Sequence, residues 1–203
     1  MDSDDSIVLI KEKIRALVRH AAQSRACVHT RQSEFVLTGI EDQYQTGQIL
    51  GNWMSLILIT GDAIKITLKL HFSHQDIKKI VYPIYGAESP AMISDQQSMD
   101  FVKELSNLTA GYLEQIFEET GISLGISLPL GTRGFYEIFA DYTPSSSPIL
   151  KFSDLWCIKH SDIKISGSVM IEISDVNAVT NILSYEEGAE TEEDDEEGEF
   201  DFL

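Results

Sequence analysis

The sequence predicts an α+β fold in which long amphipathic helices are packed on a largely antiparallel β-sheet. Three stretches carry this prediction. From Ser98 to Thr120, apolar residues recur at the spacing of one helix face. Residues 52–72 and 150–174 instead alternate between apolar and polar side chains, as strands buried on one face do. At 203 residues and 43% hydrophobic, the chain is long enough to bury one core and needs no second domain.

The N-terminal segment predicts a helix that begins at residues 4–6, which offer N-cap side chains, and ends near Ser24. Its apolar positions recur at helical spacing: Ile10, Ile14, Leu17 and Val18. Basic residues mark the other face, which fits a solvated surface better than a membrane or partner surface: Lys11, Lys13, Arg15 and Arg19. Cys27 to Gly39 indicates a strand pair, or one strand with an irregular turn, and residues 41–48 indicate a loop.

The clearest strand signal is a hairpin with its turn at or beside Gly61-Asp62. In its second strand one set of residues is apolar: Ile64, Ile66, Leu68, Leu70 and Phe72. The residues between them are polar and end at His71, which we expect to be an exposed strand residue. Ser73 then starts an S-x-x-D pattern that predicts a helix from about His74 to Tyr82, closed by Pro83 and Gly86.

The C-terminal half predicts strands after the long helix, for which Gly121 is the expected C-cap. Residues 122–129 are expected to form a strand that ends at Pro129, and residues 131–134 a turn into the segment 135–140. Residues 141–148 indicate a polar loop. Two strands follow over residues 150–160 and 162–174, and Gly167 in the second favours a bulge.

Charge divides the chain into a domain and a tail. The formal net charge is −18. The 20 residues from Ser184 carry 11 acidic and no basic side chains, which leaves 22 acidic against 15 basic side chains, a net charge of −7, in the rest. We expect a domain over residues 1–183 and a disordered acidic tail over residues 184–203, because a like-charged, low-complexity segment buries too little apolar surface to order itself. The sequence contains no basic patch, and nucleic-acid binding is therefore not predicted.

The remaining composition favours a cytoplasmic protein that binds no cofactor itself. Cys27 and Cys157 form no C-x-x-C motif, and the five histidines are scattered, so no metal site is predicted. No apolar run reaches the roughly 18 residues of a membrane span, and the acidic N-terminus is unlike a signal peptide.

The long helix also carries a coherent polar stripe opposite its apolar one: Asp100, Glu104, Asn107, Gly111 and Glu118. Asn and Gly are poor helix formers in mid-helix, and Gly costs about 0.5–1 kcal/mol relative to Ala there. A glycine lets another surface approach the backbone, and a carboxamide supplies a donor and an acceptor without charge. From the spacing alone, this stripe can also be interpreted as an ordinary solvated helix face that tolerates a glycine.

The pattern D100-x3-E104-x2-N107-x3-G111 in a long helix, followed by S-L-G-I-S-L-P-L-G, resembles the CheC/CheX family of chemotaxis phosphatases. The similarity covers roughly Ile7 to Leu183. It implies that Glu104 and Asn107 are the catalytic pair, acting on the phospho-aspartate of a CheY-like receiver domain. It further implies that Asp100 and Gly111 contact this partner. The helix expected after Ser73 has no E-x-x-N, so the resemblance is to the single-motif CheX-like form, which is a homodimer.

The resemblance implies that the receiver holds the Mg²⁺ ion and that the only further requirement for hydrolysis is a correctly placed water. A neutral carboxamide at Asn107 suits that water, while Glu104 pairs with a lysine of the receiver. Two other functions stay open. One is a non-catalytic adaptor that binds a receiver or a flagellar-switch-type partner through the same face, and the other is a sensor domain for a small ligand.

Overall fold

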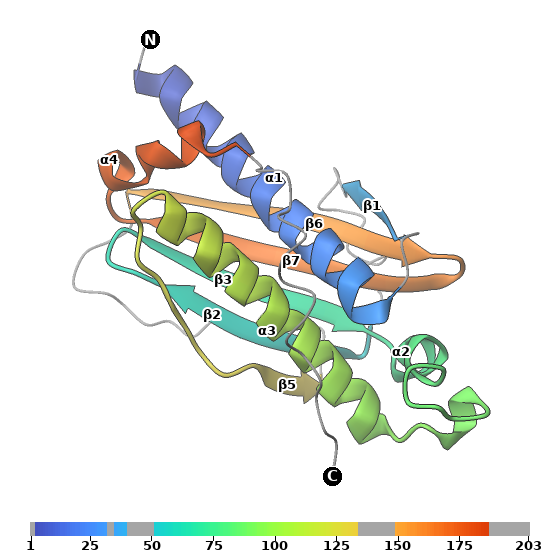
Figure 1. Ribbon diagram of the computed structural model, residues 1–203. Coiled ribbons are helices and arrows are strands. Elements are labelled where there is room, and N and C mark those ends of the chain that lie inside the picture. The colour runs from blue at the N-terminus through green and yellow to red at the C-terminus, as the bar shows by residue number, and fades with distance from the viewer. Residues whose placement is uncertain (1–2, 32–34, 40–50, 134–148, 187–203) are drawn as a thin grey trace.

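The computed structural model describes residues 3–31, 35–39, 51–133 and 149–186. Within these ranges, two long helices lie across one face of an antiparallel sheet (Figure 1). This arrangement confirms the predicted α+β class.

The three longest helices and the long strands follow the order expected from the sequence, whereas the short elements α4, η2 and η3 were not predicted. The helices are α1 (Ser3–Thr30), α2 (His74–Val81), α3 (Asp95–Glu119) and α4 (Val176–Val179), with short 3₁₀ helices η2 (Pro90–Met92) and η3 (Thr180–Ser184). The strands are β1 (Val36–Gly39), β2 (Trp53–Thr60), β3 (Ile64–Phe72), β4 (Gly125–Ile126), β5 (Leu130–Arg133), β6 (Leu150–His160) and β7 (Ile163–Ile173).

The sheet that the described residues form has the order β1-β6-β7-β3-β2-β4, with β5 paired beside β4 on the same edge of β2. Every pairing is antiparallel. The predicted hairpin β2–β3 is therefore confirmed. The two strands predicted over residues 150–160 and 162–174 pair with each other as a second hairpin, β6–β7, and the pairing of β3 with β7 places the two hairpins side by side. Tertiary structure alone decides this last pairing, because 90 residues separate the end of β3 at Phe72 from the start of β7 at Ile163.

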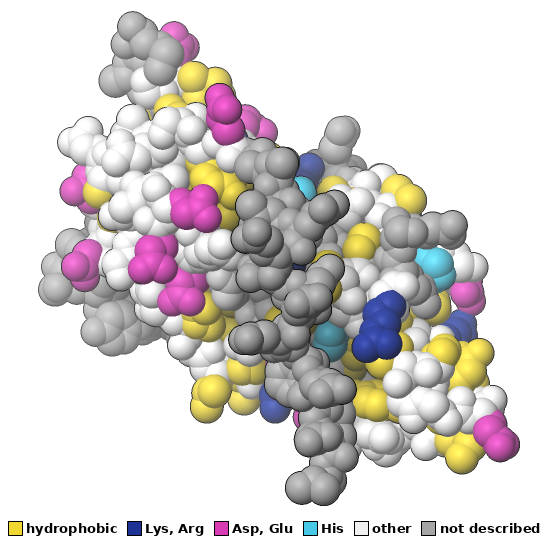
Figure 2. Space-filling model, viewed as in Figure 1, with side chains coloured by type: hydrophobic (Ala, Val, Ile, Leu, Met, Phe, Trp, Pro, Cys, Tyr) yellow, Lys and Arg dark blue, Asp and Glu magenta, His cyan; other side chains and the backbone are white. Residues whose placement is uncertain are grey.

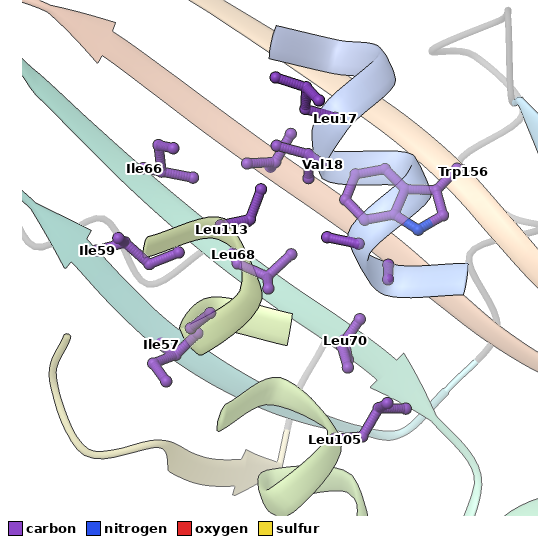
Figure 3. Packing of buried hydrophobic residues seen from close by; sticks show 14 of the residues in the cluster. Leu17, Val18, Ile57, Ile59, Ile66, Leu68, Leu70, Leu105, Leu113 and Trp156 are labelled. Carbon is purple, nitrogen blue, oxygen red and sulfur yellow. The ribbon is translucent and has the colours of Figure 1, made fainter. Parts of the chain in front are cut away.

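The core lies between the sheet and the two long helices. α1 packs over β6 and β1, while α3 packs over β2 and β3. Figure 3 shows how side chains from both layers meet: Leu17 and Val18 of α1, Leu105 and Leu113 of α3, and Ile57, Ile59, Ile66, Leu68, Leu70 and Trp156 of the sheet. All of these are at most 1% exposed. Burial of one such side chain stabilises the fold by about 1.5–3 kcal/mol.

Helix α1 is longer than predicted, and the expected strand pair at its end is wrong over Cys27–Thr30. The helix continues to Thr30, whose Oγ1 donates to the carbonyl of Ala26 at 2.6 Å. Packing against α3 accounts for the extension, because the His29 ring stacks on Phe101 with 4.2 Å between centroids. Only Val36–Gly39 of this segment forms the expected strand.

Helix α3 begins three residues before the predicted start. Ser94 and Gln97 form a capping box, in which the Ser94 side chain accepts from the Gln97 backbone N–H and the Gln97 side chain accepts from the Ser94 N–H. Gly121 was predicted as the C-cap and lies one residue beyond it, since the C-cap is Thr120. Gly121 ends the helix with φ of 81°, and the N–H of Ile122 donates to the carbonyl of Phe117 at 2.9 Å.

The single strand predicted up to Pro129 is instead two short strands, and the turn predicted at residues 131–134 is wrong where the structure describes it. Ile126 faces Ile59 and Leu130 faces Leu56, so the outer segment holds one more residue than β2 between these pairs. The mismatch is bridged by Ser127, whose N–H donates to the Leu58 carbonyl and whose Oγ accepts from the Leu58 N–H. Pro129 lacks an N–H and cannot continue the ladder.

The bulge predicted at Gly167 is also wrong. Gly167 pairs in unbroken register with Trp156 on β6 and Leu70 on β3. The reason for glycine is steric, because a Cβ there would lie 2.2 Å from Cε2 of the Trp156 indole. Glycine therefore makes room for the largest fully buried side chain of the described core.

His71 was expected to be exposed and is buried, with 8% of its surface accessible. Its Nε2 hydrogen-bonds with Ser168 Oγ of β7 at 2.9 Å, and Lys69 on the same strand is 3% exposed. Burial, with a smaller contribution from the Lys69 charge, lowers the pKa of His71 to about 4. Alternation separated the two faces of β3 correctly but did not reveal that the second face is buried at Lys69 and His71.

Several predictions concern segments outside the described residues: the loop at residues 41–48, the segment 135–140 and the loop at residues 141–148. The domain boundary at Leu183 stays a prediction. The description continues to Glu186, and Leu183 and Tyr185 pack against the core.

Candidate functional site

The outer face of α3 carries the residues that the sequence singled out. Asp100, Glu104 and Asn107 are all exposed on this helix. Side chains three residues apart on a helix lie on one face, with about 5–6 Å between Cβ atoms, so Glu104 and Asn107 are presented together. The structure thus brings the predicted pair onto one accessible face.

The inner face of α3 holds this helix firmly in place. Next to Asn107 in sequence, Ser106 is fully buried, and its Oγ donates to Ser55 Oγ on β2 at 2.8 Å. At the start of the helix, Lys78 of α2 pairs with Asp95 at 2.6 Å. Glu104 and Asn107 therefore project from a rigid element, which lowers the entropic cost of placing both groups against a partner.

Gly111 leaves the helix surface open one turn beyond Asn107. A Cβ added at this position would meet no atom within 4 Å. Gly111 also borders a surface hollow with a cavity volume of about 370 Å³. Its lining comes from α1, α3 and β4: Arg25, Asn107, Leu108, Gly111, Tyr112, Gln115 and Ile126. The predicted catalytic carboxamide and the predicted contact glycine thus share one depression.

Arg25 supplies the positive charge in this hollow. Its guanidinium lies over the Tyr112 ring, 4.5 Å from the centroid, and its Nη2 donates to Ser24 Oγ at 3.2 Å. The sequence interpretation missed Arg25 because it ended the first helix near Ser24. The small residues Ala22 and Ala26 continue the spacing of the buried face, and this signal places Arg25 on a helix that packs beside α3.

Asp100 marks the other end of the outer face. Its Oδ1 accepts from Gln96 Nε2 at 2.8 Å. Burial, together with the Asp100 charge, raises the pKa of Tyr85, a residue of the turn that follows α2. Asp100 is therefore close enough to the turn after α2 for its charge to act on Tyr85.

Charge and apolar surface are distributed unevenly around this face (Figure 2). Acidic side chains gather over the C-terminal part of α3, at the upper left, and hydrophobic ones over α2 and η2, at the lower right. The latter include Ile84, Tyr85 and Met92, all exposed. Glu104 and Asn107 lie in the middle of α3, between its N-terminal end, which pairs with α2, and its C-terminal part.

Among the described residues, no three His, Cys, Asp or Glu side chains are grouped so that they could bind a metal ion. In the same part of the chain, no helix has the length and apolar character needed to span a membrane.

Comparison with solved structures finds the same architecture in chemotaxis proteins. CheX from Vibrio vulnificus superposes with a TM-score of 0.56 at 15% identity, over 77% of this chain and 97% of that one. The chain has the fold of the CheC and CheX proteins. The CheX–CheY–BeF₃–Mg²⁺ complex from Borrelia burgdorferi matches with a TM-score of 0.54 at 13% identity, over 79% of this chain and 97% of that one.

FliY from Thermotoga maritima shares the fold as well, with a TM-score of 0.51 at 11% identity over 86% of this chain and 96% of that one. By contrast, no protein-family model matches the sequence, and no curated protein matches it. For the fold, the resemblance drawn from residues 100–131 is confirmed. At these identities the likeness concerns architecture, and the roles of individual residues remain predictions.

Proposed function

We propose that this chain is a protein phosphatase that hydrolyses the aspartyl phosphate of a CheY-like receiver domain. The observation that carries the proposal is the exposed pair Glu104 and Asn107 on one face of the rigid helix α3, beside the open surface at Gly111. The shared fold supports it, because one of the matching structures is a complex of CheX with CheY, BeF₃ and Mg²⁺.

The chemistry assigned to this chain is small. Water attacks phosphorus, the bond between phosphorus and the aspartyl oxygen breaks, and the products are inorganic phosphate and the free carboxylate. Asn107 orients the water through its carboxamide, which adds no negative charge beside the phosphoryl group. Glu104 pairs with a cation of the receiver and fixes its position. The Mg²⁺ that neutralises the phosphoryl oxygens belongs to the receiver, and the proposal places both proteins in the cytoplasm.

The decisive experiment follows phosphate loss from a phosphorylated receiver with the parent chain and with Asn107→Ala. The variant should keep its affinity for the receiver, while the rate at saturation falls by about 100-fold or more, the size expected when a reacting group loses its orientation. Asn177→Ala on α4 is the matched control, because it removes an exposed carboxamide from another helix. Equal rates for the parent and Asn107→Ala would contradict the catalytic assignment.

Glu104→Ala separates anchoring from water positioning. This variant should lose affinity for the receiver as well as rate, because its ion pair holds the partner in place. Glu118→Ala serves as the control, since Glu118 is an exposed glutamate of the same helix nearly four turns away.

The second candidate is a non-catalytic adaptor that uses the same face, and the likeness to FliY favours it. Under this alternative, Glu104→Ala weakens receiver binding, and neither the parent nor any variant accelerates phosphate loss.

We also propose that the chain forms a homodimer. In the sheet that the described residues form, β1 is one edge strand, with Val36 63% exposed, and the opposite edge carries Leu128, 91% exposed, and Leu130, 55% exposed. Edge strands with apolar side chains favour pairing with a second copy. Sedimentation at micromolar concentration tests this proposal, and a monomer there would contradict it.

A further inference from the structure

The hollow beside Asn107 is lined by one cationic side chain, Arg25, to which the proposed mechanism has assigned no role. Arg25 reaches it from α1, whereas Asn107, Gly111, Tyr112 and Gln115 belong to α3 and Ile126 to β4. Two carboxamides, a phenol and a guanidinium therefore meet around about 370 Å³ of open space. This set of groups offers mainly hydrogen-bond donors and one positive charge.

Arg25 differs from its neighbours on the same helix in having no carboxylate partner among the described residues. Arg15 pairs with Glu12 at 2.6 Å, and Arg19 pairs with Asp154 through two bonds of 2.6 Å. Among the described residues, the Arg25 guanidinium donates to Ser24 alone, and its Nε is buried without a hydrogen-bond partner, as is the Nε of Arg15. Arg25 is set apart because it lines the hollow and has no carboxylate partner there. Since buried donors are nearly always satisfied in folded proteins, its unpaired Nε beside a hollow indicates a place for an acceptor.

The position of the guanidinium is set by the fold. The Tyr112 ring supports it from α3 by a cation–π contact at 4.5 Å. A planar fork held in this way is preorganised for bidentate bonds to a phosphate or carboxylate group. A chain with a net charge of −18 repels anions in general, and a local cation is therefore needed wherever an anion is to be received.

We propose that Arg25 binds an oxyanion that the receiver presents to this hollow. This inference rests on the proposed function for the identity of the partner. Two groups of a receiver have the required chemistry: the phosphoryl group next to Asn107 and a carboxylate side chain of the receiver surface. In the first case Arg25 donates to phosphoryl oxygens while water displaces the aspartyl oxygen, and it is itself unchanged by the reaction. In the second it selects receivers with an acidic residue at this position.

The test compares the parent chain with Arg25→Gln and Arg25→Lys, and uses a receiver with and without beryllofluoride as a stable stand-in for the phosphoryl group. Arg25→Gln should weaken binding by about 10- to 100-fold, as expected for a lost charge-assisted hydrogen bond. Arg25→Lys keeps the positive charge but lacks the planar guanidinium, so its affinity for the receiver should lie between those of the parent and Arg25→Gln. Arg15→Gln is the control, because it removes the same charge from the same helix at an ion pair with Glu12. Circular dichroism verifies that each variant is folded.

The two possible oxyanions, the phosphoryl group and a carboxylate side chain of the receiver, predict different results. A phosphoryl contact confines the loss of affinity to the beryllofluoride form and lowers the hydrolysis rate at saturation. A carboxylate contact weakens both forms equally and leaves the saturated rate unchanged. If Arg25→Gln binds both forms and hydrolyses the phosphorylated receiver like the parent, the inference is wrong while the phosphatase stands. A parent chain that binds a receiver without accelerating phosphate loss contradicts the phosphatase, and the binding comparison still decides the role of Arg25.

Discussion

The outer face of α3 and the polar face of β3 look alike in the sequence, but they have opposite environments in the structure. Each is a regular series of polar residues opposite an apolar one. On α3, Glu104 and Asn107 are exposed, whereas on β3 Lys69 and His71 are 3% and 8% exposed. Helix α3 lies in the outer layer of the fold, while β3 is a central strand between β2 and β7. Regular spacing thus identifies two faces, and the layer in which an element lies decides whether the second face can meet a partner.

Two glycines show the same difference between an accessible face and a buried one. Gly111 on α3 and Gly167 on β7 both interrupt regular elements. A Cβ at Gly111 would meet nothing within 4 Å, and one at Gly167 would overlap the Trp156 ring. The first glycine leaves space for something outside the chain, and the second leaves space for the core. Substitutions at four positions test the difference between buried and accessible faces, from the largest expected effect on stability to the smallest.

Gly167→Ala should give the largest effect, a loss of unfolding free energy of about 3 kcal/mol, the upper end of the usual range for overpacking, because the added Cβ would overlap the fully buried Trp156 ring. Denaturant unfolding measures it. A loss below about 0.5 kcal/mol, the range of ordinary surface changes, would contradict the steric role of Gly167.

His71 should make stability dependent on pH. Its pKa is about 4 in the folded chain against 6.5 for an ordinary histidine, so the unfolded chain binds more protons between these values. Stability is therefore full above about pH 6.5 and falls by about 2–3 kcal/mol as the pH drops to about 4.

His71→Gln tests this dependence by removing the titrating group. Unfolding free energies measured from pH 7 to pH 4 should vary less for this variant than for the parent. Part of the dependence will remain, because burial also lowers the pKa of His29 and His74. An unchanged pH profile would contradict the assignment to His71.

Gly111→Ala should raise the unfolding free energy by about 0.5–1 kcal/mol, since alanine favours a helix and its methyl group meets no neighbour. Thermal unfolding measures the gain. Gly111→Leu should in addition weaken receiver binding, because its side chain occupies the hollow that Asn107 and Arg25 share. Unchanged affinity of the leucine variant would show that the partner does not approach the helix there.

Asn107→Ala should have the smallest effect on stability, a gain of a few tenths of a kcal/mol, because the side chain is exposed and alanine is the better helix former. The same variant is expected to lose most of the catalytic rate, so stability and activity respond in opposite directions. A marked loss of stability would mean that Asn107 supports the fold, and the contrast between the two faces would then not hold at this position.

Local patterns in the sequence were sufficient for α2, α3 and most of α1, for the hairpin β2–β3 and for the accessible face of α3. Spacing within one element depends on backbone geometry alone, and the strands β2, β3, β6 and β7 and the stripe with Glu104 and Asn107 follow from it. The capping residue Gly121 was predicted for the same reason, because its role involves only the last turn of its own helix.

Tertiary structure alone decided which faces are buried and which residues of different elements meet. The pairing of β3 with β7, the burial of His71 and the contact of Gly167 with Trp156 depend on strands distant in sequence. The hollow at Asn107 arises because α1 continues beyond Ser24 and brings Arg25 over Tyr112. Such contacts depend on how separate elements pack, and the period of a single element carries no information about its neighbours.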